Sequence, residues 1–186
     1  MLGTLTSLRA GKSIRDMASS SLVLFLLDSG TNRVPSDPAH YGRLICAAPD
    51  SNLFKTVVDH EYIPDSVEVF HEDNRLFWSC MGIPGARDGL IRSSSMEGEG
   101  CADVIGPGIL NTPKQLVLDK VGRRLIICDR EGLRIIRCEL DGSNIEALVT
   151  TGSPENEEHV RDQTRWCVGL AVDWQERRMY WTQKGS

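Results

Sequence analysis

The chain contains no apolar run long enough to cross a lipid bilayer. Its longest uninterrupted apolar stretch runs from Leu22 to Leu27, whereas a membrane-spanning helix needs about 20 apolar residues. Basic residues precede this stretch, as in a secretory signal, but Asp16 interrupts the segment and no small-residue cleavage site follows it. We therefore expect neither a membrane span nor a secretory signal.

The chain also lacks an acceptor for N-glycosylation and a disulfide framework. The nearest acceptor candidate, Asn111-Thr112-Pro113, has proline where Ser or Thr is required. Six cysteines are present without the tight spacings of a disulfide-rich domain or a zinc site; they are Cys46, Cys80, Cys101, Cys128, Cys138 and Cys167. These absences favour a reducing, intracellular compartment, so we expect a cytoplasmic protein, with secretion as the alternative.

Clusters of basic residues and recognisable catalytic motifs are absent as well. The 21 Lys and Arg residues are outnumbered by 26 Asp and Glu residues, giving a net charge of -5, whereas nucleic-acid binding needs concentrated positive charge. No metal-ligand spacing is found among the 186 residues. The sequence therefore predicts no metal site, no cofactor, and no nucleic-acid or membrane partner.

What the chain does contain is a sequence pattern that recurs about every 50 residues, which indicates a propeller or a solenoid. Each copy has four short apolar segments joined by polar turns. The first segments are 65–70, 114–119 and 168–173; the second are 24–28, 75–79, 124–129 and 178–182; the third are 43–46, 89–92 and 134–137; and the last are 54–58, 102–105 and 146–149.

Four such segments, rich in β-branched and aromatic residues, predict a four-stranded antiparallel sheet, which is one blade of a β-propeller. The predicted fold class is all-β, an incomplete β-propeller of about 3.5 four-stranded blades. Residues 1–20 are expected to form a loose or short-helical extension, and residues 21–186 the partial propeller. The expected blades are about 22–58, 65–105, 114–150 and 168–183.

Two stretches resemble a known repeat. Val168 to Trp174, followed by Tyr180-Trp181-Thr182, resembles the repeat of YWTD β-propellers of the low-density-lipoprotein-receptor type, with Gln183 in place of the final Asp. The turn Leu140-Asp141-Gly142-Ser143 is similar to the family's turn between the third and fourth strands. The resemblance implies a six-bladed, TolB-like propeller.

The resemblance also implies a role for the Asp that ends the second strand, which ties neighbouring blades together. Asp28 and Asp129 occupy this position and are expected to be blade-to-blade hydrogen-bond acceptors. Cys80 and Gln183 stand in the same position in the other two copies, so the expected tie is missing there.

The predicted propeller is incomplete. The chain enters the pattern at a second strand and leaves it at another second strand, which predicts 13 strands in all. A free sheet edge is a template for pairing and aggregation. We therefore expect this sequence to be part of a longer gene product, or a second chain or a second copy to complete the ring.

The candidate site is the channel mouth, which we define as the end of the central channel where first strands begin and second strands end. Loops at this end commonly bind ligands in propellers; they are expected at 29–41, 60–63, 81–88, 106–112, 129–132 and 152–165. The candidate ligand-binding residues are His40, His60, Glu61, Tyr62, Arg130, His159, Arg161, Arg165 and Trp166. No catalytic residue is assigned.

Each candidate also has a structural interpretation. Histidines can act as acid–base groups, pH sensors or ligands, but polar loops contain histidines by chance. Arg165 and Trp166 are typical anchors for a protein or an anionic ligand; alternatively, they belong to a solvated loop with an aromatic lid. His60 and Glu61 can pair a base with a carboxylate, or form a connection whose Tyr62 packs on the next blade.

Other residues are expected to be structural. Trp78, Trp174 and Trp181 recur with the repeat, which favours core or inter-blade packing. Cys128 and Cys138 lie on adjacent predicted strands, where they are expected to be buried, reduced thiols near each other.

The resemblance favours a module that binds a protein, peptide or small molecule at the channel mouth. The alternative is a small-molecule enzyme resembling strictosidine synthase or the gluconolactonases, which carries out cyclisation or lactone hydrolysis. This alternative rests on fold analogy, and the inward strands carry no matched Glu, Asn and Asp set. A third possibility is an inactive fragment of a larger propeller.

Overall fold

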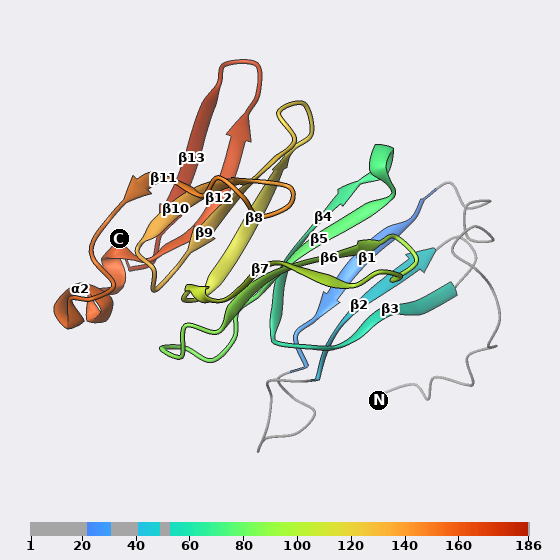
Figure 1. The fold of residues 1–186 in the computed structure, drawn as a ribbon, viewed down its shortest axis with the longest axis horizontal. Coiled ribbons are helices and arrows are strands. Elements are labelled where there is room, and N and C mark those ends of the chain that lie inside the picture. The colour runs from blue at the N-terminus through green and yellow to red at the C-terminus, as the bar shows by residue number, and fades with distance from the viewer. Residues whose placement is uncertain (1–21, 31–40, 49–52, 186) are drawn as a thin grey trace.

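The computed structural model describes residues 22–30, 41–48 and 53–185. In this part of the chain it contains 13 β-strands (Figure 1). Their bounds are β1 Leu24–Asp28, β2 Gly42–Ala48, β3 Leu53–Glu61, β4 Pro64–Phe70, β5 Arg75–Cys80, β6 Gly89–Ser95, β7 Ala102–Leu110, β8 Pro113–Asp119, β9 Arg124–Asp129, β10 Arg134–Glu139, β11 Glu146–Thr150, β12 Cys167–Asp173 and β13 Arg178–Gln183.

The strands form four antiparallel sheets in which each strand pairs with its neighbours in the chain. Sheet 1 contains β1 to β3, sheet 2 contains β4 to β7, sheet 3 contains β8 to β11, and sheet 4 contains β12 and β13. Figure 1 shows sheets 1 and 4 at opposite ends of the molecule, with sheets 2 and 3 between them. The expected all-β, incomplete propeller is confirmed, with three, four, four and two strands in successive sheets.

The first strands of successive sheets lie side by side. β4 contacts β8, and β8 contacts β12. The backbone N–H of Leu116 donates to Oγ of Ser66 at 3.2 Å, and the N–H of Leu170 donates to Oε1 of Gln115 at 2.8 Å. These bonds join sheet 2 to sheet 3 and sheet 3 to sheet 4 along a common inner line.

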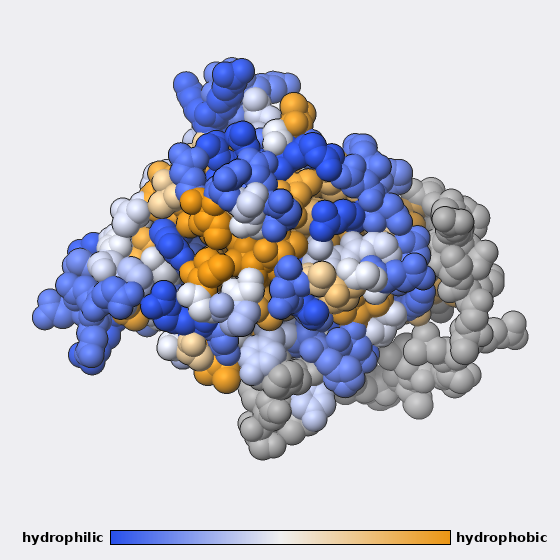
Figure 2. Space-filling model, viewed as in Figure 1, coloured by the Kyte–Doolittle hydropathy of each residue, from blue (hydrophilic) through white to orange (hydrophobic). Residues whose placement is uncertain are grey.

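Alternate residues of a strand face the two neighbouring sheets, as the period of two in a β-strand requires. In β5, Leu76 and Trp78 pack in a core shared with sheet 1, whereas Phe77 packs in a core shared with sheet 3. A third core joins sheets 3 and 4 and contains Ile126 and Leu170. Figure 2 shows hydrophobic residues gathered near the middle of the viewed face, where sheets 2 and 3 meet.

Several details differ from the expectation. β3 continues to Glu61 and β7 to Leu110, so the loops expected at 60–63 and 106–112 are largely strand. In both cases the pairing resumes after irregularities, with Gly42 opposite Glu61 and Gly89 opposite Leu110. Bulges of this kind shift the register without ending the ladder, and the sequence pattern does not show them.

The segment expected as a loop at 152–165 contains two short helices. These are α2 (Glu157–Arg161) and η4 (Gln163–Arg165), in addition to η3 (His71–Asp73) at the other end of sheet 2. The side chain of Asn156 accepts from the N–H groups of Glu158 and His159, which is the usual way to cap a helix start. Within the described residues, no helix is both long and apolar enough to span a membrane.

Two of the three repeat-linked tryptophans were predicted wrongly. Trp78 is fully buried, as expected, but Trp174 and Trp181 are 48% and 41% exposed. Trp181 lies in β13 and Trp174 in the turn between β12 and β13, and their sheet has two strands in the described part of the chain. Cys128 and Cys138 are buried free thiols, as expected, but they do not lie near each other, because they belong to different cores on opposite sides of sheet 3.

Candidate functional site

Trp166 lies at the centre of the side chains that gather at the channel mouth. It directly precedes β12, and its Nε1–H donates to the carbonyl oxygen of Val160 at 2.8 Å, which fixes the indole ring. The guanidinium carbon of Arg130 lies 4.9 Å from the ring centroid, and Nζ of Lys184 lies 5.0 Å from it. Both distances are within the range of cation–π attraction.

A buried carboxylate binds the guanidinium group of Arg130. Its Nε and Nη2 donate to the two carboxylate oxygens of Glu131 at 2.9 and 2.6 Å, and Glu131 is 5% exposed. The backbone carbonyl of Glu131 accepts from Nδ2 of Asn111 at 3.0 Å. A bidentate pair of this geometry orients the guanidinium plane, so Arg130 is fixed beside Trp166.

The segment before Trp166 is tied to the end of sheet 3. Arg165 donates through Nη1 to the carbonyl oxygen of Thr151 at 2.6 Å and through Nε to Asp162 at 3.1 Å. His159 accepts at Nδ1 from the N–H of Ser153 at 3.1 Å. These bonds make the segment from Gly152 to Arg165 an ordered wall of the site.

The structure brings two of the nine candidate residues, Arg130 and Trp166, together with Lys184, and we call these three side chains the Trp166 surface. The candidates His159, Arg161 and Arg165 belong to α2 and η4, in the segment that precedes Trp166 in the chain. Arg161 pairs with Glu157 at 2.8 Å across one helical turn. The polar groups of Arg130, Lys184 and Trp166 converge from three different segments, which is the arrangement expected of a binding surface.

Two residues beside Arg130 and Trp166 were not predicted to belong to the site: Glu131 and Lys184. Lys184 follows β13 directly, and its N–H donates to the carbonyl of Trp166 at 3.0 Å. The antiparallel register places Gln183 opposite Cys167, so continuing the predicted hairpin by one residue would have found Lys184. Nothing in the sequence distinguishes Glu131 from an ordinary turn residue.

Among the other candidates, His40 lies outside the described residues, and His60, Glu61 and Tyr62 do not join this surface. His60 is exposed at the end of β3, and its N–H donates to the side chain of Asp59 at 2.9 Å. Tyr62 packs against the core between sheets 1 and 2, which agrees with its structural interpretation.

Glu61 is buried between sheets 1 and 2, with 1% of its surface exposed. Its Oε2 accepts from Nε1 of Trp78 at 2.8 Å and from the thiol of Cys80 at 3.2 Å, and its Oε1 is paired with Arg92. The carboxylate comes from sheet 1 and all three partners come from sheet 2. Glu61 is therefore a tie between sheets, and the structure does not place it as an orienting partner for His60.

Asp129 forms the corresponding tie between sheets 2 and 3, as the resemblance implied. Its Oδ1 accepts from the N–H groups of Asn111 and Thr112 at 2.9 and 3.0 Å, and its Oδ2 accepts from Arg134 at 3.1 Å. Burial raises the pKa of this carboxyl above its ordinary value, while Arg134 and the backbone donors act in the opposite direction. Asp28 accepts from the N–H of Gly30 at 3.0 Å and from Nε of Arg43 at 3.1 Å.

The thiols of the inter-sheet cores are poor nucleophiles. Burial raises the pKa of Cys128 to about 12, with the charges of Cys167 and Asp129 acting in the same direction. Burial also raises the pKa of Cys138 to about 11. Since the thiolate is the reactive form, neither residue is suited to nucleophilic catalysis.

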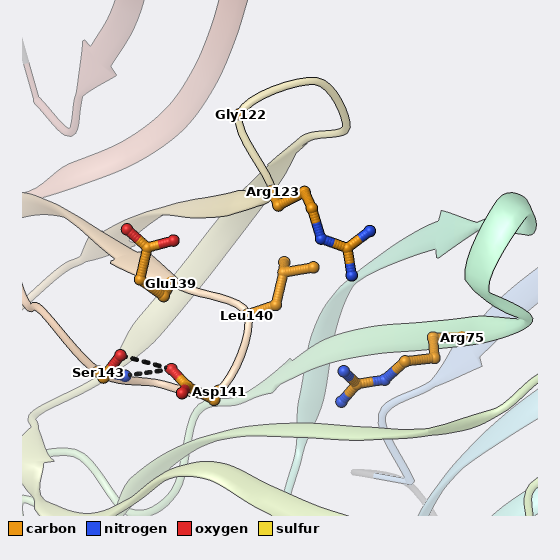
Figure 3. Close-up of a pocket in the computed structure, with 7 residues that line it drawn as sticks. All are labelled: Arg75, Gly122, Arg123, Glu139, Leu140, Asp141 and Ser143. Carbon is orange, nitrogen blue, oxygen red and sulfur yellow. Dashed lines mark hydrogen bonds between the residues drawn. The ribbon is translucent and has the colours of Figure 1, made fainter.

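A hollow that was not predicted lies at the opposite end of sheets 2 and 3. It has a volume of about 520 Å³ and is lined by Arg75, Gly122, Arg123, Glu139, Leu140, Asp141 and Ser143. Figure 3 shows that these side chains come from separate turns around an open space. Its charges are largely paired: Arg123 donates to Asp73 at 2.5 Å, and Arg124 pairs with Glu139 at 3.3 Å.

Among residues 22–30, 41–48 and 53–185, no group of three or more His, Cys, Asp or Glu residues is placed to hold a metal ion. The Trp166 surface offers two cations, an aromatic ring and hydrogen-bonding groups, which are suited to binding a ligand.

Comparison with known proteins defines the type of propeller. No family model matches the chain. The chain is 37% identical over 166 residues to low-density lipoprotein receptor-related protein 1 of Pyricularia oryzae, covering 87% of this chain and 53% of that protein. Among solved structures, a nidogen/laminin complex superposes with a TM-score of 0.61 at 17% identity, covering 86% of this chain and 52% of that one. These likenesses support a partial β-propeller of the low-density-lipoprotein-receptor YWTD type.

Two further proteins are similar to the chain. The 3-hydroxyacyl-CoA dehydrogenase-like protein LAM1 of Cochliobolus heterostrophus is 40% identical over 171 residues, which is 92% of this chain and 36% of that protein. A gluconolactonase from Xanthomonas campestris superposes with a TM-score of 0.60 at 15% identity, covering 87% of this chain and 50% of the enzyme. The YWTD chain thus spans about a third of one curated relative and about half of the other.

Proposed function

We propose that this partial propeller is a binding module that recognises a protein or peptide through the Trp166 surface. The observation that supports the proposal is the pair of cations, Arg130 and Lys184, on the ring of Trp166. Trp and Arg are enriched among residues that dominate binding energies, because they combine apolar area with directional polar groups. Arg130 is also preorganised by Glu131, which reduces the entropy cost of binding.

The chemistry of this surface indicates a ligand with a carboxylate next to an apolar group. The ammonium of Lys184 and the outer guanidinium edge of Arg130 attract the anion, while the half-buried indole offers apolar area. The segment that precedes Trp166 in the chain is acidic: it carries Glu155 before α2, and Glu157 and Glu158 in the first turn of α2. They disfavour a ligand of high negative charge, so recognition depends on a single well-placed anionic group.

A peptide selection tests this function. A random 12-residue peptide library displayed on phage is selected against the immobilised chain, and the enriched peptides are synthesised. We expect their affinity to fall about tenfold or more in Trp166→Ala and Lys184→Ala, as for anchor residues at a recognition surface. His71→Ala, in η3 at the opposite end of sheet 2, serves as the control and should bind normally.

Failure to enrich any peptide, or binding that is equal in the wild type and in both variants, would contradict the proposal. Lys184 is exposed, so its replacement tests recognition without disturbing a core.

We also propose that the protein works in a reducing, intracellular compartment. Cys80, Cys128, Cys138 and Cys167 are free thiols buried in the cores, whereas cysteines of secreted domains commonly form disulfides. Localisation of a fluorescently tagged chain in its host cells tests this proposal, and accumulation in the secretory pathway would contradict it.

A further inference from the structure

The sequence contains two dipeptides in which a hydroxyl residue precedes proline, Thr112-Pro113 and Ser153-Pro154. Proline directly after the hydroxyl residue is the feature that proline-directed protein kinases select, so the sequence alone offers two phosphate acceptors. The structure separates them. Thr112 is 0% exposed, and its N–H donates to Oδ1 of the buried Asp129 at 3.0 Å. A kinase therefore has no access to Thr112 in the folded chain.

Ser153 is exposed, in the segment that joins β11 to α2. Its Oγ accepts from the N–H of Glu155 at 3.3 Å, and its carbonyl oxygen accepts from the N–H of Asn156 at 3.1 Å. Among the residues that the structure describes, none accepts the hydroxyl proton of Ser153. The hydroxyl group thus lies in an exposed turn, where another enzyme can reach it.

The segment around Ser153 is also inexpensive to open, as a kinase requires when it binds a substrate in an extended conformation. The helix that follows, α2, is five residues long and contains no buried residue. Segments with few buried groups open locally at a small part of the free energy of global unfolding. Ser153 therefore combines the acceptor sequence with exposure and with a low cost of local opening.

The cation nearest to this turn along a printed contact is Arg87, in the loop after β5. Its Nη1 lies 3.4 Å from Oε1 of Glu155, with 52% of the arginine side chain and 75% of the glutamate side chain exposed. An exposed contact of this kind contributes little to stability. A phosphate on Ser153 would carry a charge of about −1.5 to −2 at pH 7, so it would compete with Glu155 for the guanidinium. Glu157 and Glu158, in the first turn of α2, repel the phosphate and favour its displacement toward Arg87.

We propose that Ser153 is a phosphorylation site of a proline-directed kinase, and that its phosphate binds Arg87. In the transfer, Oγ of Ser153 forms a bond to the γ-phosphorus of ATP, the bond from that phosphorus to ADP breaks, and the catalytic Asp of the kinase accepts the hydroxyl proton. Phosphate and guanidinium form charge-assisted hydrogen bonds, which are about twice as strong as neutral ones. The phosphate thereby ties the segment before Trp166 to the loop after β5.

This proposal rests on the intracellular compartment proposed above, where ATP and protein kinases are present, but not on ligand binding by the Trp166 surface. Localisation of the tagged chain is measured in cells, whereas the site is tested on the purified chain. Failure of the compartment and failure of the site are therefore distinguishable.

Phosphorylation is tested on the full folded chain with a purified proline-directed kinase and ATP, and the modified residues are located by tandem mass spectrometry. We expect a phosphate on Ser153 and none on Thr112. Ser153→Ala is the control and should lose this phosphate, since the replaced side chain is exposed and the variant should fold normally. A folded chain without phosphate on Ser153, or one that accepts it only after denaturation, would overturn the proposal.

Binding of the phosphate to Arg87 is tested by limited trypsin cleavage after Arg161, whose side chain is 78% exposed in α2. Cleavage follows the population of the locally opened segment when opening and closing are fast. We expect phosphorylation to slow this cleavage by about threefold or more in the wild type and to leave it unchanged in Arg87→Gln.

Arg137→Gln is the matched control for the arginine replacement. It removes another exposed ion pair, between Arg137 and Glu146, and should respond to phosphorylation as the wild type does. If phosphorylation does not slow cleavage in the wild type, or slows it equally in Arg87→Gln, the phosphate does not bind Arg87 and the proposed tie is wrong.

Discussion

Individual carboxylates tie neighbouring sheets together, and they come from different positions at different junctions. In sheet 3 the tie is Asp129, which ends β9 and pairs with Arg134. In sheet 2 the corresponding positions hold Cys80 and Leu90, which face each other across β5 and β6. The carboxylate is supplied there by Glu61 of the preceding sheet, and its cationic partner is Arg92.

This change of position explains why the sequence was misleading at Glu61. The repeat pattern showed that Cys80 replaces the expected Asp, but it did not show where a substitute carboxylate would come from. Glu61 looked like a loop residue because the irregular register of β3 hides the end of the strand. Its burial is a consequence of tertiary packing, which a single sequence does not encode in any local signal.

Replacing Glu61 by Gln tests the tie. The variant keeps an acceptor for Trp78 but leaves Arg92 without its buried counter-charge. Breaking a buried ion pair from one side costs about 3–5 kcal/mol, and we expect a decrease of about 3 kcal/mol in the free energy of unfolding, measured by urea denaturation.

Asp103→Asn is the control for this measurement. Asp103 pairs with the same arginine, at 2.9 Å, but its side chain is 45% exposed. An exposed pair contributes about 1 kcal/mol or less. Equal losses in the two variants would contradict the role assigned to Glu61.

The ion pair of Asp73 and Arg123 leads to a second prediction, which concerns how the stability of the folded chain depends on pH. The hydrogen bond from Arg123 lowers the pKa of Asp73 below its ordinary value, and the charges of Arg123 and Arg75 act in the same direction. A lowered carboxyl pKa contributes stability above the pKa of the unfolded chain, and this contribution is lost as the pH falls through the folded-state pKa.

The wild type is therefore expected to be more stable than Asp73→Asn at pH 7, and the difference should disappear as the pH is lowered below about 4, the usual range of an Asp carboxyl. Thermal unfolding of both proteins across this range provides the measurement. A difference that persists unchanged at pH 2.5 would show that the pair does not act through the charge of Asp73.

At the scale of the elements, the turn between the third and fourth strands joins neighbouring sheets at their outer edge. Gly142 in the turn from β10 to β11 has φ +82, and a Cβ added to it would lie 1.9 Å from the carbonyl oxygen of Val104 in sheet 2. Gly98, in the turn from β6 to β7, makes the same approach to Val57 of sheet 1, at 2.1 Å. Glycine is required in both turns because a Cβ atom at either position would clash with a backbone carbonyl of the neighbouring sheet.

Gly142→Ala should therefore destabilise the protein more than the backbone conformation alone explains. Gly108 is the matched control, since its φ is +89 and nothing lies within 4 Å of an added Cβ. Both variants carry the strain of a positive φ, but only Gly142→Ala also forces sheets 2 and 3 apart. We expect an additional loss of about 2 kcal/mol, the usual cost of overpacking, in urea unfolding.

Similar losses for Gly142→Ala and Gly108→Ala would show that the turn does not hold the sheets together. The resemblance to the Leu-Asp-Gly-Ser turn of the family pointed to this position, and the close approach gives its glycine a physical reason.

The number and order of the strands could be predicted at this scale because each strand has its own apolar segment and each turn its own polar residues. The ends of β3 and β7 could not be predicted, since irregular pairing prolongs them beyond their apolar segments. The helical turn of α2 was missed as well, although Asn156 followed by Glu157 and Glu158 is a recognisable helix start.

For the whole molecule, the recurrence of the pattern was sufficient to predict the stacking of sheets, because each copy has apolar residues on both faces and needs a neighbour on each side. The Trp166 surface was predictable in part for the same reason: the order of strands places second-strand ends and first-strand starts at one end of the molecule. The exposure of Trp174, Trp181 and Tyr180 was not predicted, since repeat counterparts were assumed to have equal surroundings.

The central claim is that successive sheets stack with their first strands side by side. Nuclear Overhauser contacts in the amide spectrum of the folded chain test it most directly. The account predicts a contact between the amide proton of Leu116 and the β protons of Ser66, and another between the amide proton of Leu170 and the side chain of Gln115, as their hydrogen bonds require. A spectrum that shows the cross-strand contact of Leu116 with Ile127 within sheet 3, but neither of the contacts between sheets, would contradict the stacked arrangement.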